Sequence, residues 1–245
     1  MNTNLSLEKC LAFVNCQLQP PRKGSGRNGH NRRLAVTFSR QTGCGARAIA
    51  EKLAQRLQER GAGNEAPWTL FDRNLVEQVL EDHSLPKRLA RFMPEDRISE
   101  IEDTIDDLFG LHPPSWMLVR DTAETILRLA ELGNVVLIGR GANVITSGLE
   151  HVFHVRLVAP LENRLESVQQ SRHMSAKEAL AFIQTEDKGR RRYLKKYFHK
   201  NIDDPLLYHL VINTGVMPQD QAVGVLCDAV LSMQTSHTPA RLQTA

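Results

Sequence analysis

The sequence predicts an α/β protein, a three-layer sandwich in which about five parallel strands lie between layers of helices. Short apolar runs typical of buried strands alternate along the chain with amphipathic stretches typical of helices. Few hairpin signals separate these runs, which favours parallel pairing through helical crossovers. The first strand-to-helix turn also carries two glycines, Gly43 and Gly45, at a position where such sheets bind ligands.

The composition is that of an ordinary globular protein. The 245 residues are 41% hydrophobic and 24% charged, and the formal net charge of +3 is mild for a nucleic-acid binder. The four cysteines lack the spacing of a disulfide framework or a metal site. No apolar stretch reaches the length of a membrane span, and the N-terminus lacks a signal pattern. We therefore expect a cytoplasmic protein with neither nucleic acid nor membrane as partner; its oligomeric state is not predicted.

The chain divides into three predicted parts. Residues 1–33 are expected to form an N-terminal extension, a short amphipathic helix followed by a flexible basic linker. Residues 34–234 are expected to form the domain, with a helical insertion at 84–132 and a helical lid at 176–202. Residues 235–245 are expected to be a disordered tail.

Each element of the domain has its own signal. Strands are predicted where apolar, often β-branched residues run together: 34–38, 68–71, 135–138, 153–158 and 208–213. Helices are predicted where apolar residues recur at helical spacing: from Ala46 to Gly61, from Asp72 to about 80, over 95–109, over 115–132, after Pro160 and after Pro218. Ser175 and Glu178 form a capping box that opens a long basic helix to about His199, which Asp203, Asp204 and Pro205 end.

The turn after the first strand has the character of a phosphate-binding loop. Gly43 and Gly45 allow the backbone to curl so that successive N–H groups point inward, and the following helix adds its positive N-terminal end. The residues expected to surround the phosphates are Ser39, Arg40, Thr42, Gly43, Cys44, Gly45, Ala46, Arg47 and Ala48. A tight strand-to-helix turn that binds no ligand is the alternative.

The loop departs from the usual P-loop pattern. Ala46 stands where that pattern has lysine, and Ala48 where it has the Ser or Thr that binds magnesium. Arg40 and Arg47 flank the glycines and can supply positive charge, although the planar guanidinium does not reproduce the point charge of a lysine. No acidic residue at the end of the 135–138 strand suggests a magnesium ligand, and no metal-ligating side chains are predicted.

Five stretches resemble the cytidylate kinase-like family, in the same order and at similar spacing over about residues 34–232. They are Phe38-Ser39-Arg40-Gln41-Thr42-Gly43-Cys44-Gly45-Ala46-Arg47, Phe71-Asp72-Arg73, Val136-Leu137-Ile138-Gly139-Arg140-Gly141-Ala142, the set Asp187, Arg190, Tyr193, Lys195 and Phe198, and Leu210-Val211-Ile212-Asn213-Thr214. Cys44 and Ala46 replace residues that are commonly Ser and Gly in the family. The resemblance implies a P-loop nucleoside-monophosphate-kinase fold, ATP as phosphate donor, and Mg²⁺ held mainly through the phosphates.

The acceptor side of the site is expected around Asp72, Arg73, Gly139, Arg140 and Asp187. Arg140 follows a buried strand and is expected to clamp the acceptor monophosphate, a salt bridge at the sheet edge being the alternative. Asp72 either accepts a hydrogen bond from base or sugar, acts as a base, or caps the helix that follows it.

The basic helix is the predicted lid. Arg190 and Arg191, with Arg47 beside the glycine loop, are the candidates for stabilising charge on the transferred phosphoryl group, and Asp187 is expected to orient Arg190 and Arg191. A solvated basic face is the alternative for this run of charges.

The leading hypothesis is a phosphotransferase that moves the γ-phosphate of ATP to a nucleoside monophosphate, CMP or dCMP by resemblance. A weakly active or inactive nucleotide-binding sensor or partner-binding module is the alternative, favoured by Ala46 and Ala48. A kinase for another small phosphate acceptor is the third hypothesis.

Overall fold

Five parallel strands form the centre of the protein, in the order β2-β3-β1-β4-β5. The computed structural model describes residues 33–61, 67–72, 95–109 and 117–236. The strands are β1 (Ala35–Arg40), β2 (Thr69–Phe71), β3 (Val135–Ile138), β4 (Val152–Val158) and β5 (Leu210–Asn213). The first strand pairs with β3 on one side and β4 on the other, so its carboxyl end lies at the centre of the sheet.

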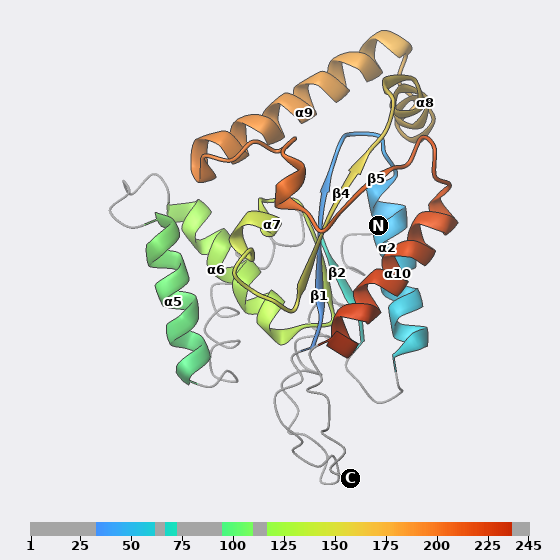
Figure 1. Cartoon of the computed structure of the whole chain (residues 1–245). Coiled ribbons are helices and arrows are strands. Elements are labelled where there is room, and N and C mark those ends of the chain that lie inside the picture. Colours follow the sequence, from blue (N-terminus) through green and yellow to red (C-terminus); the bar gives the residue numbers. More distant parts are fainter. Residues whose placement is uncertain (1–32, 62–66, 73–94, 110–116, 237–245) are drawn as a thin grey trace.

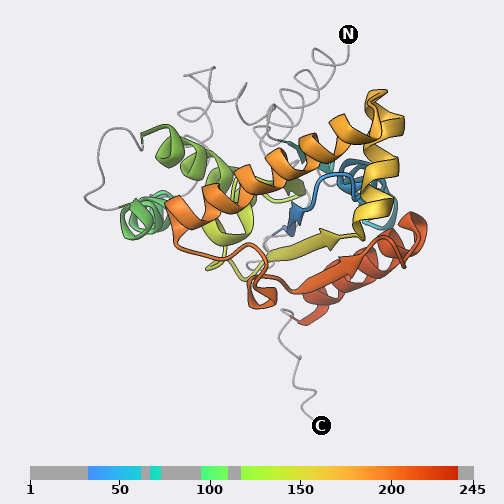
Figure 2. The ribbon, with the colours of Figure 1, turned by 90° about the horizontal axis from the view of Figure 1, so that it is seen from above.

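Helices cover both faces of the sheet, and one more helix crosses its carboxyl edge (Figures 1 and 2). On one face lie α2 (Ala46–Arg60) and α10 (Gln219–Ser236). On the other lie α5 (Glu95–Phe109), α6 (Met117–Leu132) and the short α7 (Ala142–Ile145). After β4 come α8 (Leu161–Arg172), α9 (Ala176–Phe198) and the 3₁₀ turn η2 (Pro205–Leu207).

Two hydrophobic cores hold the layers together because successive strand residues point to opposite faces. Val36 and Phe38 of β1 face α2 and α10, whereas Ala35 faces α6 and α7. Thr37 and Ser39 lie on the same face of β1 as Ala35, nearer to its carboxyl end, and their side chains are polar and buried. On the side of α6 and α7, the hydrophobic core therefore ends just below the carboxyl edge of the sheet, where polar side chains replace apolar ones.

The predicted fold class and all five predicted strands are confirmed, with small shifts at the boundaries. The final strand begins at Leu210 rather than at residue 208, because the Tyr208 N–H donates to the Pro205 carbonyl in the preceding 3₁₀ turn. Pro160 is the N-cap of α8 instead of lying in its first turn, and α10 runs to Ser236, two residues into the predicted tail. The predicted helix after Asp72, and the extension apart from Arg33, lie outside the described residues.

The long helix α9 is fixed at its start by the predicted capping box. The Ser175 hydroxyl accepts from the Glu178 N–H at 3.4 Å, and the Glu178 carboxylate accepts from the Ser175 N–H at 2.9 Å. The Ser175 hydroxyl, which donates to the Glu178 carboxylate at 2.7 Å, and then the Ser175 N–H lower the pKa of Glu178. Within the part of the chain that the structure describes, no helix is both long and apolar enough to cross a bilayer.

Candidate functional site

A cavity of about 370 Å³ lies where the ends of β1 and β3 meet the underside of α9. From β1, the turn after β3 and α7, it is lined by Ser39, Arg40, Gly139, Arg140, Gly141 and Asn143. From α9 and the segment after it come Thr185, Glu186, Gly189, Arg190, Tyr193, Leu194 and Ile202. The carboxyl edge of a parallel sheet is the usual ligand site of such folds, and the volume falls within the range of small-molecule sites.

The glycine loop, residues 39–47, curls as the sequence predicts. Gly43 and Gly45 have φ of 85° and 74°, a region that L-residues with side chains rarely adopt. A methyl group on Gly43 would lie 2.5 Å from the carbonyl oxygen of Arg164, so the close approach of α8 also requires glycine there. Gly45 caps α2 without any side-chain hydrogen bond, and the first turn of α2 holds no acidic residue. The N–H groups at this helix start are therefore suited to an external anion.

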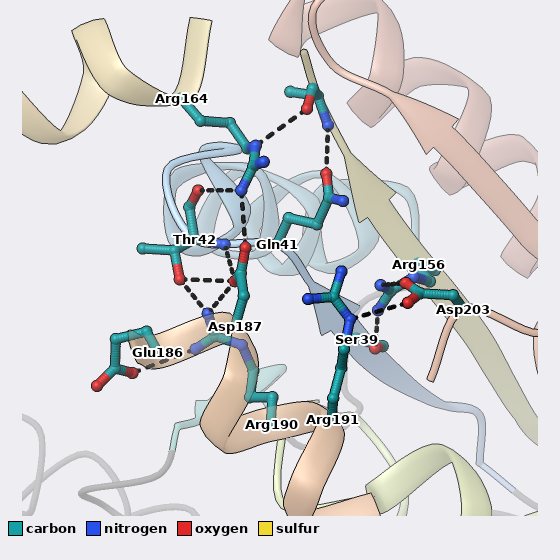
Figure 3. Close-up of polar contacts among 11 residues, drawn as sticks. Ser39, Gln41, Thr42, Arg156, Arg164, Glu186, Asp187, Arg190, Arg191 and Asp203 are labelled. Carbon is teal, nitrogen blue, oxygen red and sulfur yellow. Dashed lines mark hydrogen bonds and ion pairs between the residues drawn. The ribbon is translucent and has the colours of Figure 1, made fainter. Parts of the chain in front are cut away.

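One N–H group of the loop is already bound by a carboxylate from α9 (Figure 3). Asp187 accepts hydrogen bonds from the backbone N–H and the hydroxyl of Thr42, both at 2.9 Å. Its other oxygen accepts from Arg164 of α8 at 2.7 Å. Burial alone would raise the pKa of Asp187, but the bonds from Arg190 and Thr42 outweigh it and hold that pKa below the ordinary value. An internal anion thus occupies the edge of the predicted phosphate loop.

The two candidate lid arginines point to different partners. Arg190 donates to Asp187 at 2.5 Å and to the Thr42 hydroxyl, so it lies beside the glycine loop. Arg191 instead donates to Asp203 at 3.0 Å, away from the loop (Figure 3). The prediction that Asp187 orients both arginines is therefore wrong for Arg191, because Asp203, beyond the end of α9, lies closer to its guanidinium.

Arg40 gives the cavity a concentrated positive charge. Burial, and then repulsion from Arg190, lower the pKa of Arg40 to about 10, and weaker attraction from Glu186 and Asp72 does not compensate. The Arg40 guanidinium lies against Gly139, where any side chain would collide with it. Among the described residues, no ion pair or hydrogen bond joins Arg40 to a carboxylate. An anionic ligand in the cavity would relieve this repulsion.

The turn after β3 holds its backbone in an uncommon conformation. Gly139, Arg140 and Gly141 have φ of 85°, 53° and 73°, three left-handed residues in succession. For Arg140 this conformation costs about 1 kcal/mol or more, and such strain concentrates at functional sites. The turn places Arg140 at the cavity beside Tyr193, whose pKa burial raises to about 12 while Arg140 opposes the rise. Arg40, Arg140 and Arg190 therefore meet at one cavity.

Other predicted residues lie outside the cavity. Arg47 donates to Glu51 at 2.9 Å and to Asp72 at 2.7 Å, with 61% of its side chain exposed. The side chains of Cys44 and Ala46 are buried in the core against α2 and α10, so the larger Cys44 does not narrow the loop. Burial raises the pKa of the Cys44 thiol to about 11. Ala48 lies in the first turn of α2, and Arg73 lies outside the described residues.

Sequence reasoning missed three side chains that the structure places at the site. Arg164 bonds Asp187 across the loop, and Asn143 lines the cavity from the first turn of α7. Arg156 of β4 is buried and donates to Ser39 at 2.8 Å. Arg164 lies in the first turn of the helix after a buried strand, and a basic residue at that position could have indicated a place at the carboxyl edge of the sheet. No sequence signal indicated the role of Arg156, because its hydrogen-bond partner Ser39 is distant in the sequence.

The parallel sheet and the cationic cavity at its carboxyl edge define an α/β protein of the three-layer class with a site suited to a small anionic ligand. The chain belongs to the cytidylate kinase-like family, whose sequence model matches residues 35–216. This membership supports a nucleotide-kinase-like function.

Individual relatives are distant. A cytidylate kinase from Methanopyrus kandleri is 28% identical over 170 residues, which cover 66% of this chain and 86% of that protein. A uronate isomerase from Corynebacterium glutamicum is also 28% identical, over 120 residues, but the match spans only 23% of that protein. The crystal structure of an uncharacterized protein from Eubacterium ventriosum has a TM-score of 0.56 at 19% identity and covers 82% of this chain and 99% of that chain, which shows a shared fold alone.

Proposed function

We propose that this protein transfers the γ-phosphate of ATP to a nucleoside monophosphate, with CMP or dCMP as the acceptor. The observation that carries the proposal is the cavity between the sheet edge and α9, in which Arg40, Arg140 and Arg190 converge in a member of the cytidylate kinase-like family. Phosphoryl transfer needs positioning and charge neutralisation more than covalent chemistry. Three guanidinium groups around one small cavity can supply both.

In this proposal the two substrates approach from two sides of Arg190. The acceptor phosphate lies in the cavity against Arg40 and Arg140, and the donor phosphates lie on the N–H groups at the start of α2. Asp187 leaves Thr42 when the donor binds, which releases Arg164 and Arg190 to bind the transferred group. We assign Arg191 no part in this step, because it points away from the loop toward Asp203.

Among the described residues, no three His, Cys, Asp or Glu side chains lie close enough together to hold a metal ion. These residues therefore do not form a metal cage, and no step above runs through a metal. We propose that Mg²⁺ arrives with ATP and is held mainly by its phosphates.

A nucleotide-binding module without kinase activity is the second candidate. It is favoured by Ala46, buried where an active loop would hold lysine, and by the bond between Asp187 and Thr42. A coupled ADP-release assay with CMP, dCMP, UMP and AMP separates the two functions. The kinase predicts turnover with at least one acceptor and its loss in Arg140→Ala, while Arg60→Ala, which removes an exposed arginine paired with Asp228, keeps it. ATP binding by calorimetry without turnover would favour the module, and the absence of both would refute both functions.

A further inference from the structure

Asn143 is a buried polar side chain whose amide nitrogen lacks an internal partner. It lies in α7 directly after the strained turn, and only 5% of its surface is exposed. Its Nδ2 atom makes no hydrogen bond with any residue that the structure describes. Nearly all buried polar groups in proteins are hydrogen-bonded, and leaving one unpaired is costly. Asn143 also lines the cavity, so a turn of its side chain would bring this enclosed, unpaired amide to a ligand there.

The position of Asn143 is held firmly by the packing around it. Gly141, which caps α7, lies so close to α9 that a methyl group there would be 2.9 Å from the Phe198 ring and 3.3 Å from Leu194. The residues on either side, Ala142 and Val144, are buried in the core between the sheet and α6. The backbone that carries Asn143 is therefore fixed beside the cavity, and only its side chain is left to turn.

The lining of the cavity has two chemically different parts. Arg40, Arg140 and Arg190 provide positive charge. Asn143 shares the lining with Tyr193, Leu194 and Ile202, which belong to the apolar core or pack against it. A phosphate suits the first part, whereas a flat ring with polar atoms on one edge suits the second. One mononucleotide combines both groups, and a cavity of about 370 Å³ has room for a ligand of that size.

We propose that Asn143 recognises the base of the acceptor nucleotide, its Nδ2 donating a hydrogen bond to a ring nitrogen or carbonyl oxygen of the base. This inference rests on the proposed function, because it concerns the acceptor in the same cavity. Asn143 is then the residue that distinguishes a nucleotide from a simple sugar phosphate. A site built to hydrogen-bond a ligand discriminates strongly against an analogue that lacks the group.

The test compares CMP with ribose 5-phosphate, which keeps the phosphate and the sugar but has no base. Calorimetry on the full-length protein should show CMP binding more tightly than ribose 5-phosphate. In Asn143→Ala, CMP affinity should fall about tenfold or more, the cost of one lost buried hydrogen bond. The affinity for ribose 5-phosphate should change less than about twofold, since no base is present. Asn163→Ala, at an exposed asparagine of α8 outside the cavity, should leave both affinities unchanged.

A second variant, Asn143→Leu, guards against misfolding because it keeps the branched shape of the side chain and removes its polar atoms. Since the amide nitrogen gains no internal hydrogen bond, this variant should have a thermal midpoint equal to or above that of the wild type, together with the same loss of CMP affinity. A marked fall in its midpoint would overturn the inference, because it would show a structural role for the amide.

The outcomes also separate this inference from the proposed function. Equal loss of CMP and ribose 5-phosphate affinity in both variants, or no loss of CMP affinity, would overturn the role of Asn143 and leave the kinase proposal intact. Equal binding of the two ligands by the wild type would likewise show that the base is not recognised. If the wild type binds neither CMP nor ATP, the proposed function fails and this inference fails with it.

Discussion

Two arginines at the carboxyl edge of the sheet, Arg156 of β4 and Arg40 of β1, differ in how their charge is satisfied. The side chain of Arg156 is 4% exposed, and its guanidinium donates to Ser39 at 2.8 Å and to Asp203 at 2.6 Å. It also lies over the ring of Tyr208, 5.7 Å from the ring centre. Arg40, one residue beyond the partner of Arg156 in the ladder, faces the cavity and is repelled by Arg190.

The difference shows how to separate structural arginines from ligand-binding ones. A buried cation whose donors meet internal acceptors stabilises the fold, and removing it or its partner is expensive. A cation that faces a cavity and repels its neighbour contributes nothing comparable to folding, so its presence points to a ligand. Stability and ligand affinity, measured on variants of each kind of arginine, test this distinction.

Arg156→Ala should lower the free energy of unfolding by about 3 kcal/mol, because it breaks a buried ion pair and leaves a void beside Ser39. Urea denaturation followed by circular dichroism measures this change. Arg191→Ala provides the control, since that more exposed arginine pairs with the same Asp203 and should cost less than about 0.5 kcal/mol. Equal losses in the two variants would remove the distinction between Arg156 and its exposed neighbours.

Arg40→Ala should weaken the binding of CMP or ATP by about tenfold to a hundredfold, the range for one charged hydrogen-bond partner. Its free energy of unfolding should stay within about 0.5 kcal/mol of the wild type or rise, because the repulsion from Arg190 disappears. Calorimetry and urea denaturation on the same preparation measure both quantities. A loss of stability as large as that of Arg156→Ala would show that Arg40 is structural.

His154, on the same face of β4 as Arg156, should make stability depend on pH. Burial and the neighbouring His209 lower the pKa of His154 to about 4, from an ordinary value of 6.5. Between these two pKa values, His154 is therefore protonated in the unfolded chain and neutral in the folded protein. Stability is complete above pH 6.5 and is lost as the pH falls toward 4, by about 1–2 kcal/mol between pH 7 and pH 5. Unfolding curves of His154→Asn should show a smaller loss over this range, and an unchanged pH dependence would contradict the assignment.

Asp187→Asn should bind ATP about fivefold more tightly than the wild type, the smallest of the four effects. The neutral amide competes less well for the Thr42 N–H and releases Arg164 and Arg190. Calorimetry with ATP measures the change, and Glu166→Gln, which neutralises an exposed carboxylate of α8 bonded to Gln170, should leave the affinity for ATP unchanged. Weaker ATP binding in Asp187→Asn would show that the carboxylate assists the ligand instead of competing with it.

The sequence predicted those parts of the fold that depend on residues close together in the chain. The strands, the start and end of α5, and the capping box of α9 follow from periodicity and from the pairing of Ser175 with Glu178. The curled loop followed from Gly43 and Gly45, since only glycine enters that backbone region easily. These features are decided within a few residues of chain.

What the sequence did not reveal depends on distant neighbours. Arg190 and Arg191 have nearly equal spacing from Asp187 along the helix, and only the position of Asp203 directs Arg191 away. Asn143 is distinguished by a buried amide nitrogen without a hydrogen-bond partner, and the absence of a contact cannot be predicted from the sequence. Arg164 acquires its importance from α8 lying against Gly43.

The carboxylate of Asp187 on the Thr42 N–H also sets a threshold for what can bind there. Chloride or a single phosphate would have to displace a tethered anion that is already held by two arginines. Displacement lowers the apparent affinity of every ligand by the same factor, so weak binders are lost first. Only a molecule with several linked negative charges recovers that loss through additional contacts. If the loop binds phosphates as proposed, we expect α9 to keep chloride and single phosphates from occupying it.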